Sequence, residues 1–334
     1  MASTPDATAE PGRAHLPLWD GYCADPFVLR AEDGRYVMYG TTPVALPEGR
    51  AFQVLVSEDL ETWEDAGGAL VVGERPPGTE YWAPEVAYSD GCYWMYYSSG
   101  IGDKEHRLRV ATSPSATGPF EDLGLVLTPD VPFAIDPSPY RATDGSWWLF
   151  YATDLVEGDR PGTVLAVQRL LDMTRLEGDP TIVLRASAEW QRYEADREIY
   201  GGVHDWHTLE GPSVMDDGEG GCLLLYSGGN WQTPGYGVAL ASAPAPTGPW
   251  HEDPDRGPVV TSAGTGLIGP GHCSVLTDED GSRHLILHAW DPSLDRRRPH
   301  RLALHVDGRQ VSVSSDPPAP PHHHHSPHEG HGHE

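Results

Sequence analysis

Four acidic residues and one histidine stand at similar places in five short, strand-like phrases of the chain. They are Asp25, Glu85, Asp136, Glu210 and His272, which precede Asp-Gly pairs by 8, 5, 8, 7 and 8 residues. Taken singly, an Asp-Pro or a Glu-Gly-Pro is typical of a turn or a strand edge. The shared register of all five instead predicts that they meet at one functional site. A cluster of buried, unpaired charges costs too much free energy to be explained by packing alone.

Carboxylates that face one another suit the hydrolysis of glycosides. One carboxylic acid protonates the leaving oxygen, while a carboxylate activates water or attacks carbon. A third carboxylate close by raises the pKa of the acid by like-charge repulsion and keeps it protonated near neutral pH. The 11 Trp and 14 Tyr residues add amphipathic rings that can pack against sugar faces.

The Asp-Gly pairs themselves form a repeat, at 33–34, 90–91, 144–145, 217–218 and 280–281. Asp-Gly between apolar runs predicts a tight hairpin, since both residues tolerate positive φ. The runs after the pairs predict strands at 36–40, 93–98, 147–151, 222–226 and 284–290. Further strands are predicted at 53–56, 107–112, 163–169, 236–242 and 301–306, and fourth strands at 71–72, 125–127, 182–184 and 259–260.

Five four-stranded units that cannot bury both faces alone predict an all-β, five-bladed β-propeller. A pair of β-sandwich domains is the structural alternative, but it does not account for five matched hairpins. We expect a flexible arm at 1–14, a catalytic propeller at 15–315 and a disordered Pro/His-rich tail at 316–334. The segment 15–21 is predicted to supply a strand that closes the ring with the last blade.

The charge balance excludes several classes of partner. With 22 basic and 50 acidic residues, a net charge of −28 and a single lysine, the protein would repel nucleic acid and anionic membranes. No apolar run reaches the ~18–20 residues of a membrane span. Because the first residues lack a basic start followed by an apolar stretch, and the four cysteines are widely spaced, we expect a cytoplasmic protein with reduced thiols.

The phrases that carry these residues resemble the blade-opening motifs of glycoside hydrolase family 43. They read Cys-Ala-Asp-Pro-Phe-Val at 23–28, Tyr-Trp-Ala-Pro-Glu-Val at 81–86, Ala-Ile-Asp-Pro-Ser-Pro at 134–139, Thr-Leu-Glu-Gly-Pro-Ser-Val at 208–214 and Gly-Pro-Gly-His-Cys-Ser-Val at 269–275. The resemblance implies a five-bladed propeller that hydrolyses arabinose- or xylose-containing glycosides with inversion. It implies Asp25 as general base, Glu210 as general acid, and Asp136 as the residue that tunes the acid's pKa and orients the sugar.

The resemblance also implies further roles around the axis. His272 matches a histidine that reaches a hydrated calcium ion in arabinan-cleaving relatives, and the alternative is a satisfied polar core residue. No organic cofactor is expected. Arg301 is expected to approach the acid pair, with Arg298 as an alternative and a surface arginine run as the plainer interpretation. The expected sugar-contacting residues are Trp82, Glu85, Trp206 and Trp231, although each tryptophan could equally pack between blades.

The expected substrate is an oligosaccharide or polysaccharide, and the oligomeric state is left open. The chain lacks the extra β-sandwich of two-domain β-xylosidases, which favours an exo-acting α-L-arabinofuranosidase. An endo-1,5-α-L-arabinanase and a single-domain β-xylosidase are the alternatives. Three rivals are a propeller phosphorylase, which needs a basic phosphate pocket, a retaining fructosyl hydrolase, whose carboxylates would lie closer together, and a non-enzymatic carbohydrate-binding propeller.

Overall fold

The computed structural model describes residues 16–43, 46–253 and 255–315, and these residues form a molecule built almost entirely of strands. The expected N-terminal arm at 1–14 and the Pro/His-rich tail at 316–334 lie outside the described residues. Within the described part of the chain, no helix is both long and apolar enough to cross a membrane.

Most strands pair antiparallel with their neighbours in the sequence. The first sets are β1 (Ala24–Arg30), β2 (Tyr36–Thr41), β3 (Arg50–Ser57) and β4 (Glu64–Val71), then β5 (Thr79–Ser89), β6 (Cys92–Ile101), β7 (Lys104–Ser113) and β8 (Phe120–Val126). Next come β9 (Ala134–Arg141), β10 (Trp147–Leu155), β11 (Gly162–Leu171) and β12 (Arg175–Leu184). The last sets are β14 (Gly202–Asp216), β15 (Cys222–Gly228), β16 (Gly237–Ala243) and β17 (His251–Glu252), then β18 (Ile268–Thr277), β19 (Arg283–Trp290), β20 (Arg297–Asp307) and β21 (Gln310–Ser314).

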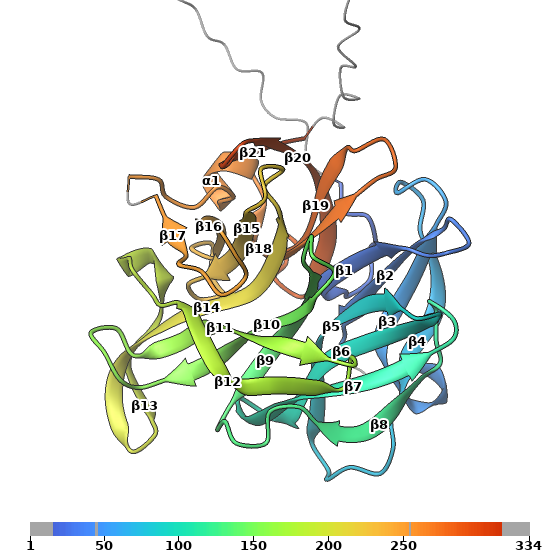
Figure 1. Cartoon of the computed structure of the whole chain (residues 1–334), viewed down its shortest axis with the longest axis horizontal. Helices are drawn as coiled ribbons and strands as arrows, with labels where there is room; N and C mark the ends of the chain where they lie inside the picture. Colours follow the sequence, from blue (N-terminus) through green and yellow to red (C-terminus); the bar gives the residue numbers. More distant parts are fainter. Residues whose placement is uncertain (1–15, 44–45, 254, 316–334) are drawn as a thin grey trace, which may run out of the picture.

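These sets follow one another around a common axis, and the colours of Figure 1 run around the molecule in sequence order. Parallel pairing joins β4 to β8 and β11 to β14. One additional strand, β13 (Arg192–Ile199), pairs with the first half of β14 and forms a hairpin that projects at the lower left of Figure 1. The helical elements among the described residues are two 3-10 turns, Pro47–Gly49 and Glu189–Gln191, and the four-residue α1 (Ser262–Thr265).

The predicted hairpins are confirmed. All five Asp-Gly pairs connect antiparallel partners: β1 and β2, β5 and β6, β9 and β10, β14 and β15, and β18 and β19. Their glycines take φ values of 87°, 76°, 84°, 80° and 83°, a region in which any side chain is strained. The turn residues therefore fix where each first strand ends and its partner begins.

Two predicted strands are corrected. The fourth strand expected at 259–260 is β17 instead, and Val260 makes only an isolated bridge to Val238. The segment expected to close the ring is not a strand in its described part, and β21 pairs with β20 in its place. The early segment still contacts β20, because the Leu18 N–H donates to the Pro299 carbonyl at 2.8 Å and the Cys23 N–H to the Arg297 carbonyl at 3.0 Å.

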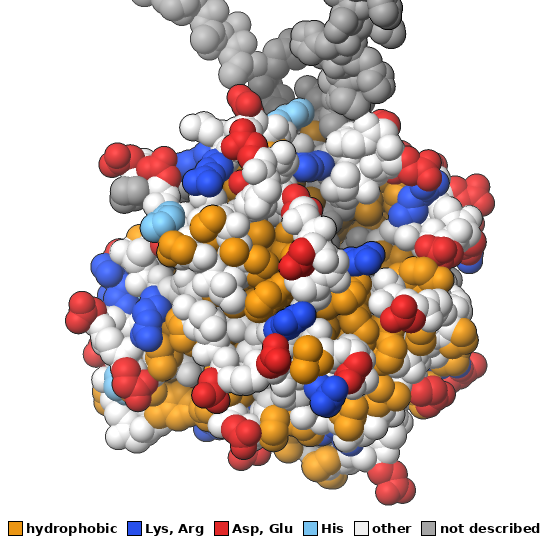
Figure 2. All heavy atoms as spheres, viewed as in Figure 1, with side chains coloured by type: hydrophobic (Ala, Val, Ile, Leu, Met, Phe, Trp, Pro, Cys, Tyr) orange, Lys and Arg blue, Asp and Glu red, His pale blue; other side chains and the backbone are white. Residues whose placement is uncertain are grey.

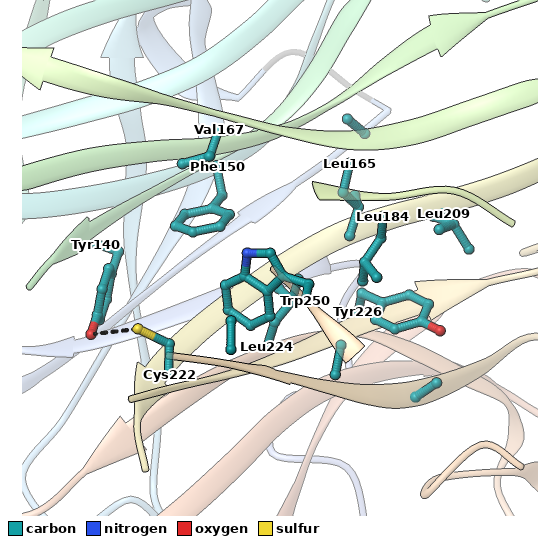
Figure 3. Close-up of a cluster of buried hydrophobic side chains, with 14 of the residues drawn as sticks. Tyr140, Phe150, Leu165, Val167, Leu184, Leu209, Cys222, Leu224, Tyr226 and Trp250 are labelled. Carbon is teal, nitrogen blue, oxygen red and sulfur yellow. Dashed lines mark hydrogen bonds between the residues drawn. The ribbon is translucent and has the colours of Figure 1, made fainter. Parts of the chain in front are cut away.

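Large aromatic side chains fill the space between neighbouring sheets. Figure 3 shows one such cluster, in which the rings of Phe150 and Trp250 meet edge to face with centroids 5.9 Å apart. Beside them the Tyr140 hydroxyl lies 3.6 Å from the Cys222 sulfur. All four cysteines are free, and three of them are buried, which agrees with packing thiols. This packing between sheets holds their first strands in fixed positions around the axis.

Candidate active site

A β-bulge interrupts the first strand of each repeated unit, and the bulges set the geometry of the site. The pairing register shifts at each bulge, and one residue there adopts a left-handed backbone. Those residues are Asp25, Ala83, Asp136, Gly211 and His272, with φ between 48° and 57°. Bulges re-aim side chains and are frequent next to active sites, and strained non-glycine residues concentrate there as well.

The five predicted residues are therefore only partly equivalent. Asp25, Asp136 and His272 occupy the left-handed bulge position, whereas Glu210 precedes it by one residue and Glu85 follows it by two. Asp25, Asp136, Glu210 and His272 line one cavity of about 470 Å³, but Glu85 does not. The spacing to the Asp-Gly turn could not reveal this, because it does not say which residue takes the left-handed conformation.

Asp25 lies in a setting that favours its ionised form. Its Oδ1 accepts a hydrogen bond from Nη1 of Arg297 at 3.2 Å, and the Asp25 backbone N–H donates to Nδ1 of His288 at 3.0 Å. Burial alone would raise the pKa of Asp25, but Arg297, His272 and His288 together outweigh it, Arg297 most strongly, and hold that pKa well below its usual range. Burial also lowers the pKa of His288 to about 4, so its Nδ1 is free to accept.

Glu210 and Asp136 lie in settings that favour their protonated forms. Burial and the neighbouring Asp25 raise the pKa of Glu210 to about 7, although the Tyr236 hydroxyl, which donates to Glu210 Oε1 at 2.6 Å, pulls it down. Burial and the charge of Glu210 raise the pKa of Asp136 as well. Asp136 Oδ2 accepts from the Gly211 N–H at 2.9 Å, which fixes the carboxyl beside the strand that carries Glu210. The cavity thus offers a carboxylate and a protonated carboxyl at the same pH.

His272 lies between the two aspartates. Its Nδ1 is 3.4 Å from Asp25 Oδ1 and 4.0 Å from Asp136 Oδ2, and its backbone N–H donates to the Ser227 hydroxyl at 2.7 Å. Burial lowers the pKa of His272, so the ring is neutral at pH 7. The neutral imidazole separates two acidic groups without adding charge.

The predicted calcium ion finds few protein ligands here. Among the described residues, no group of three or more His, Cys, Asp or Glu side chains is arranged to hold a metal. Calcium prefers six to eight oxygen ligands, and a lone imidazole that faces carboxylates does not supply them. The residues present do not fit a protein-ligated calcium site, so no step below uses an ion. A water-coordinated ion beside His272 stays a prediction.

Arg297 is one of the site residues that the sequence reasoning missed, as are Tyr236 and Tyr22. Its side chain is 13% exposed, and its guanidinium lies 4.4 Å from the Trp231 ring centroid and donates from Nε to the Tyr22 hydroxyl at 3.0 Å. Sequence reasoning pointed to Arg301, but Arg301 pairs with Glu61 and does not line the cavity. Four residues along a strand shift a side chain by about 13 Å, so only one of these arginines can reach Asp25.

The predicted aromatic residues divide in the same way. Trp82 and Trp231 line the cavity, as expected of groups that contact a sugar. Trp206 does not: it is 1% exposed and packs beneath Tyr200 in the β13–β14 hairpin, with ring centroids 6.0 Å apart. The alternative Arg298 pairs with Asp20 and Asp291 and is also absent from the cavity wall.

Comparison with known proteins decides the family. The family model described as "Glycosyl hydrolases family 43" matches residues 15–311. The chain belongs to glycosyl hydrolase family 43. This hydrolase is 27% identical to a crystal structure titled a thermostable family-43 glycoside hydrolase, with a TM-score of 0.77 over 93% of this chain and 100% of that one.

Relatives of this family-43 hydrolase carry several names. It is 25% identical to an extracellular exo-α-(1→5)-L-arabinofuranosidase of Streptomyces avermitilis, over 84% of this chain and 58% of that protein. It is 27% identical to a β-D-galactofuranosidase of Aspergillus niger, over 87% and 80%. It is 26% identical to an extracellular endo-α-(1→5)-L-arabinanase of Bacillus subtilis, over 70% and 56%. The chain thus spans less than two thirds of the Streptomyces and Bacillus relatives.

These names correct the predicted location. The cytoplasmic expectation rested on the missing basic-then-apolar pattern in the first residues. It is contradicted by the relatives, because the Streptomyces and Bacillus enzymes are both named extracellular. The absence of a leader pattern in a single sequence was too weak an observation to assign a compartment.

Proposed function

We propose that this family-43 hydrolase is an exo-acting α-L-arabinofuranosidase that works with inversion at the anomeric carbon. The observation that carries the proposal is that the pKa values of two carboxyls in one cavity are shifted in opposite directions, down for Asp25 and up for Glu210. Arg297 keeps Asp25 ionised, whereas burial raises the pKa of Glu210 to about 7. Inverting and retaining glycosidases both pair an ionised carboxylate with a protonated carboxyl, and we infer inversion from the membership of family 43.

The roles of the two carboxyls follow from their pKa values. Asp25 accepts a proton from a water molecule whose oxygen forms the new bond to the anomeric carbon. Glu210 gives its proton to the glycosidic oxygen as the old carbon–oxygen bond breaks, and the leaving alcohol departs neutral. Asp136, held by the Gly211 N–H, orients the sugar, and because its titration is linked to that of Glu210, ionisation of one of these carboxyls raises the pKa of the other. Each turnover leaves Asp25 protonated and Glu210 ionised, and exchange with water restores both.

The choice of a terminal furanose is supported by the shape of the cavity and by the relatives. The connection between β2 and β3 supplies Thr42, Pro43 and Gly49 to one wall, and Arg297 and Trp231 form another. A cavity of about 470 Å³ lies in the range of small-molecule sites. Two relatives are named for arabinofuranoside and galactofuranoside substrates, both five-membered rings. We also infer that each four-stranded set is one blade of five.

The test is a substrate panel on the purified protein. It contains aryl α-L-arabinofuranoside, aryl β-D-xyloside, aryl β-D-galactofuranoside, arabino-oligosaccharides and linear arabinan. We expect the arabinofuranoside to be hydrolysed fastest, the oligosaccharides to lose single terminal sugars, and proton NMR to show an inverted first product. Random internal cleavage of arabinan would favour the endo-arabinanase alternative, and preference for the xyloside would favour the β-xylosidase.

Two variants test the roles separately. Glu210→Gln is expected to abolish turnover of substrates with poor leaving groups while it still binds them, because only the proton donor is lost. Asp25→Asn is expected to remove activity on every substrate, because the water is no longer activated. Near-normal rates for both variants would overturn the assignment.

A further inference from the structure

A second cavity of about 800 Å³ shares no lining residue with the catalytic one, and nothing in the proposed mechanism uses it. Its walls come from Asp103 in the connection between β6 and β7, from the start of β7 (Lys104, Glu105 and Arg107), and from the tip of the β13–β14 hairpin, residues 198–203. Pro132, just before β9, completes the wall. The hairpin is the element that the repeated four-stranded units do not account for.

The two walls of this second cavity are tied together. Arg197 of the hairpin pairs through Nη2 with Oδ2 of Asp103 in the β6–β7 connection at 2.7 Å. The Arg197 guanidinium also lies over the rings of Tyr193 and Trp206, at 5.1 and 5.6 Å from their centroids. The Tyr200 hydroxyl donates to Asp154 Oδ2 at 2.7 Å. The cavity is therefore held open in advance, which lowers the entropic cost of binding.

The second cavity is close to the catalytic one. Pro132 in its wall is four residues before Asp136, and four residues of extended chain span at most about 14 Å. A chain of contacting residues also connects the walls of the two cavities. Trp82 lines the catalytic cavity and stacks on His106 with centroids 3.7 Å apart, and His106 Nε2 is 2.9 Å from the Gly102 carbonyl beside the second cavity.

The chemistry of the wall favours a neutral, hydroxyl-rich ligand. Tyr200 and Val203 are 47% and 61% exposed and offer an aromatic and an apolar surface. Charged side chains of both signs line the cavity: the bases Lys104 and Arg107, the acids Glu105 and Glu198, and Asp103, whose charge is paired with Arg197. Because these signs alternate, neither an anion nor a cation is favoured, whereas hydroxyl groups can donate to the acids and accept from the bases.

We propose that this second cavity is a subsite for the leaving-group side of an oligosaccharide whose terminal sugar occupies the catalytic cavity. The inference rests on the proposed hydrolysis of a terminal sugar and adds where the rest of the chain binds. The hairpin subsite, defined by Tyr200, Val203, Lys104 and Arg107, would make the enzyme prefer chains over single-ring glycosides. Binding energy collected there is available to position the scissile bond.

The test compares a short and a long substrate in Tyr200→Ala. An aryl pentofuranoside has one small ring as its leaving group and serves as the reference, and an arabinotetraose is long enough to extend toward the hairpin. We expect the ratio of kcat/KM for tetraose to kcat/KM for the aryl glycoside to fall about tenfold, mainly through KM. Val203→Asp, at a 61% exposed position that packing does not constrain, is expected to lower the same ratio.

The matched control is Tyr88→Ala, which removes another exposed tyrosine that lines neither cavity, and its ratio should equal that of the natural protein. An unchanged ratio in both hairpin variants would overturn the subsite, as would an equal loss on both substrates. If no pentofuranoside is hydrolysed, the proposed function fails. The subsite is then judged by calorimetry with Glu210→Gln: affinity for arabino- or xylo-oligosaccharides that rises with length, and does so less in Tyr200→Ala, supports it, and length-independent affinity refutes it.

Discussion

Asp25 and Arg297, separated by 271 intervening residues, meet at 3.2 Å in the floor of the catalytic cavity. The contact joins the first strand of the first sheet to the first residue of β20. It contributes most to the low pKa of Asp25, which a general base requires. In the same pocket the pKa values of Asp136 and Glu210 are raised. The acidic limb of the enzyme's pH profile is therefore expected to respond to this ion pair.

Replacing Arg297 by methionine should raise the pKa of Asp25, because the nearest positive charge is lost while burial remains. The acidic limb of the kcat/KM–pH profile should move to higher pH, and the rate at the optimum should fall about a hundredfold. Arg297→Lys keeps a charge and should move the limb less. A limb that stays in place in Arg297→Met would contradict the role of the pair.

Replacing Tyr236 by phenylalanine should act on the other limb. The Tyr236 hydroxyl donates to Glu210 and lowers its pKa, so its loss should raise that pKa above about 7. The basic limb, which reports the Glu210–Asp136 pair as a unit, should then move to higher pH. The measurement is kcat/KM against pH with an unactivated substrate. A shift to lower pH would contradict the assignment of Glu210 as the acid.

Glu85 should make the protein less stable as the pH rises. Burial raises its pKa from 4.5 to about 8 in spite of a hydrogen bond with Ser138. A carboxyl whose folded pKa is raised contributes stability below its unfolded pKa, and that contribution is lost as the pH rises from about 4.5 to 8. Glu85→Gln should therefore be more stable than the natural protein at pH 8, by several degrees in Tm. The difference should vanish near pH 4, which differential scanning calorimetry can measure.

Trp206 and Trp231 should respond differently to alanine. Trp206 is buried, so its truncation should cost about 3–5 kcal/mol of unfolding free energy. Trp231 lines the cavity over Arg297, so its truncation should raise KM with a smaller effect on stability. Chemical denaturation and steady-state kinetics on both variants separate the two outcomes. Equal destabilisation by both variants would show that Trp231 also has a packing role.

The repeat pattern predicted the hairpins and brought Asp25, Asp136, Glu210 and His272 to one place, since Asp-Gly turns fix where strands begin. It failed where the choice depended on conformation rather than residue type. Ala83 takes the left-handed position that spacing assigned to Glu85, and no side-chain signal marks an alanine for that role. Arg297 was missed because three consecutive arginines look alike until strand pairing places one of them beside Trp231.

The contacts that bind the early segment to β20 also order events during synthesis. The Cys23 N–H bonds to the Arg297 carbonyl, and the Arg297 side chain then reaches Asp25 two residues further on. Asp25 leaves the ribosome 272 residues before its guanidinium partner. A nascent chain that has released only the strands before β20 carries Asp25 without Arg297, so Asp25 acquires this ion pair only when β20 docks against the early segment.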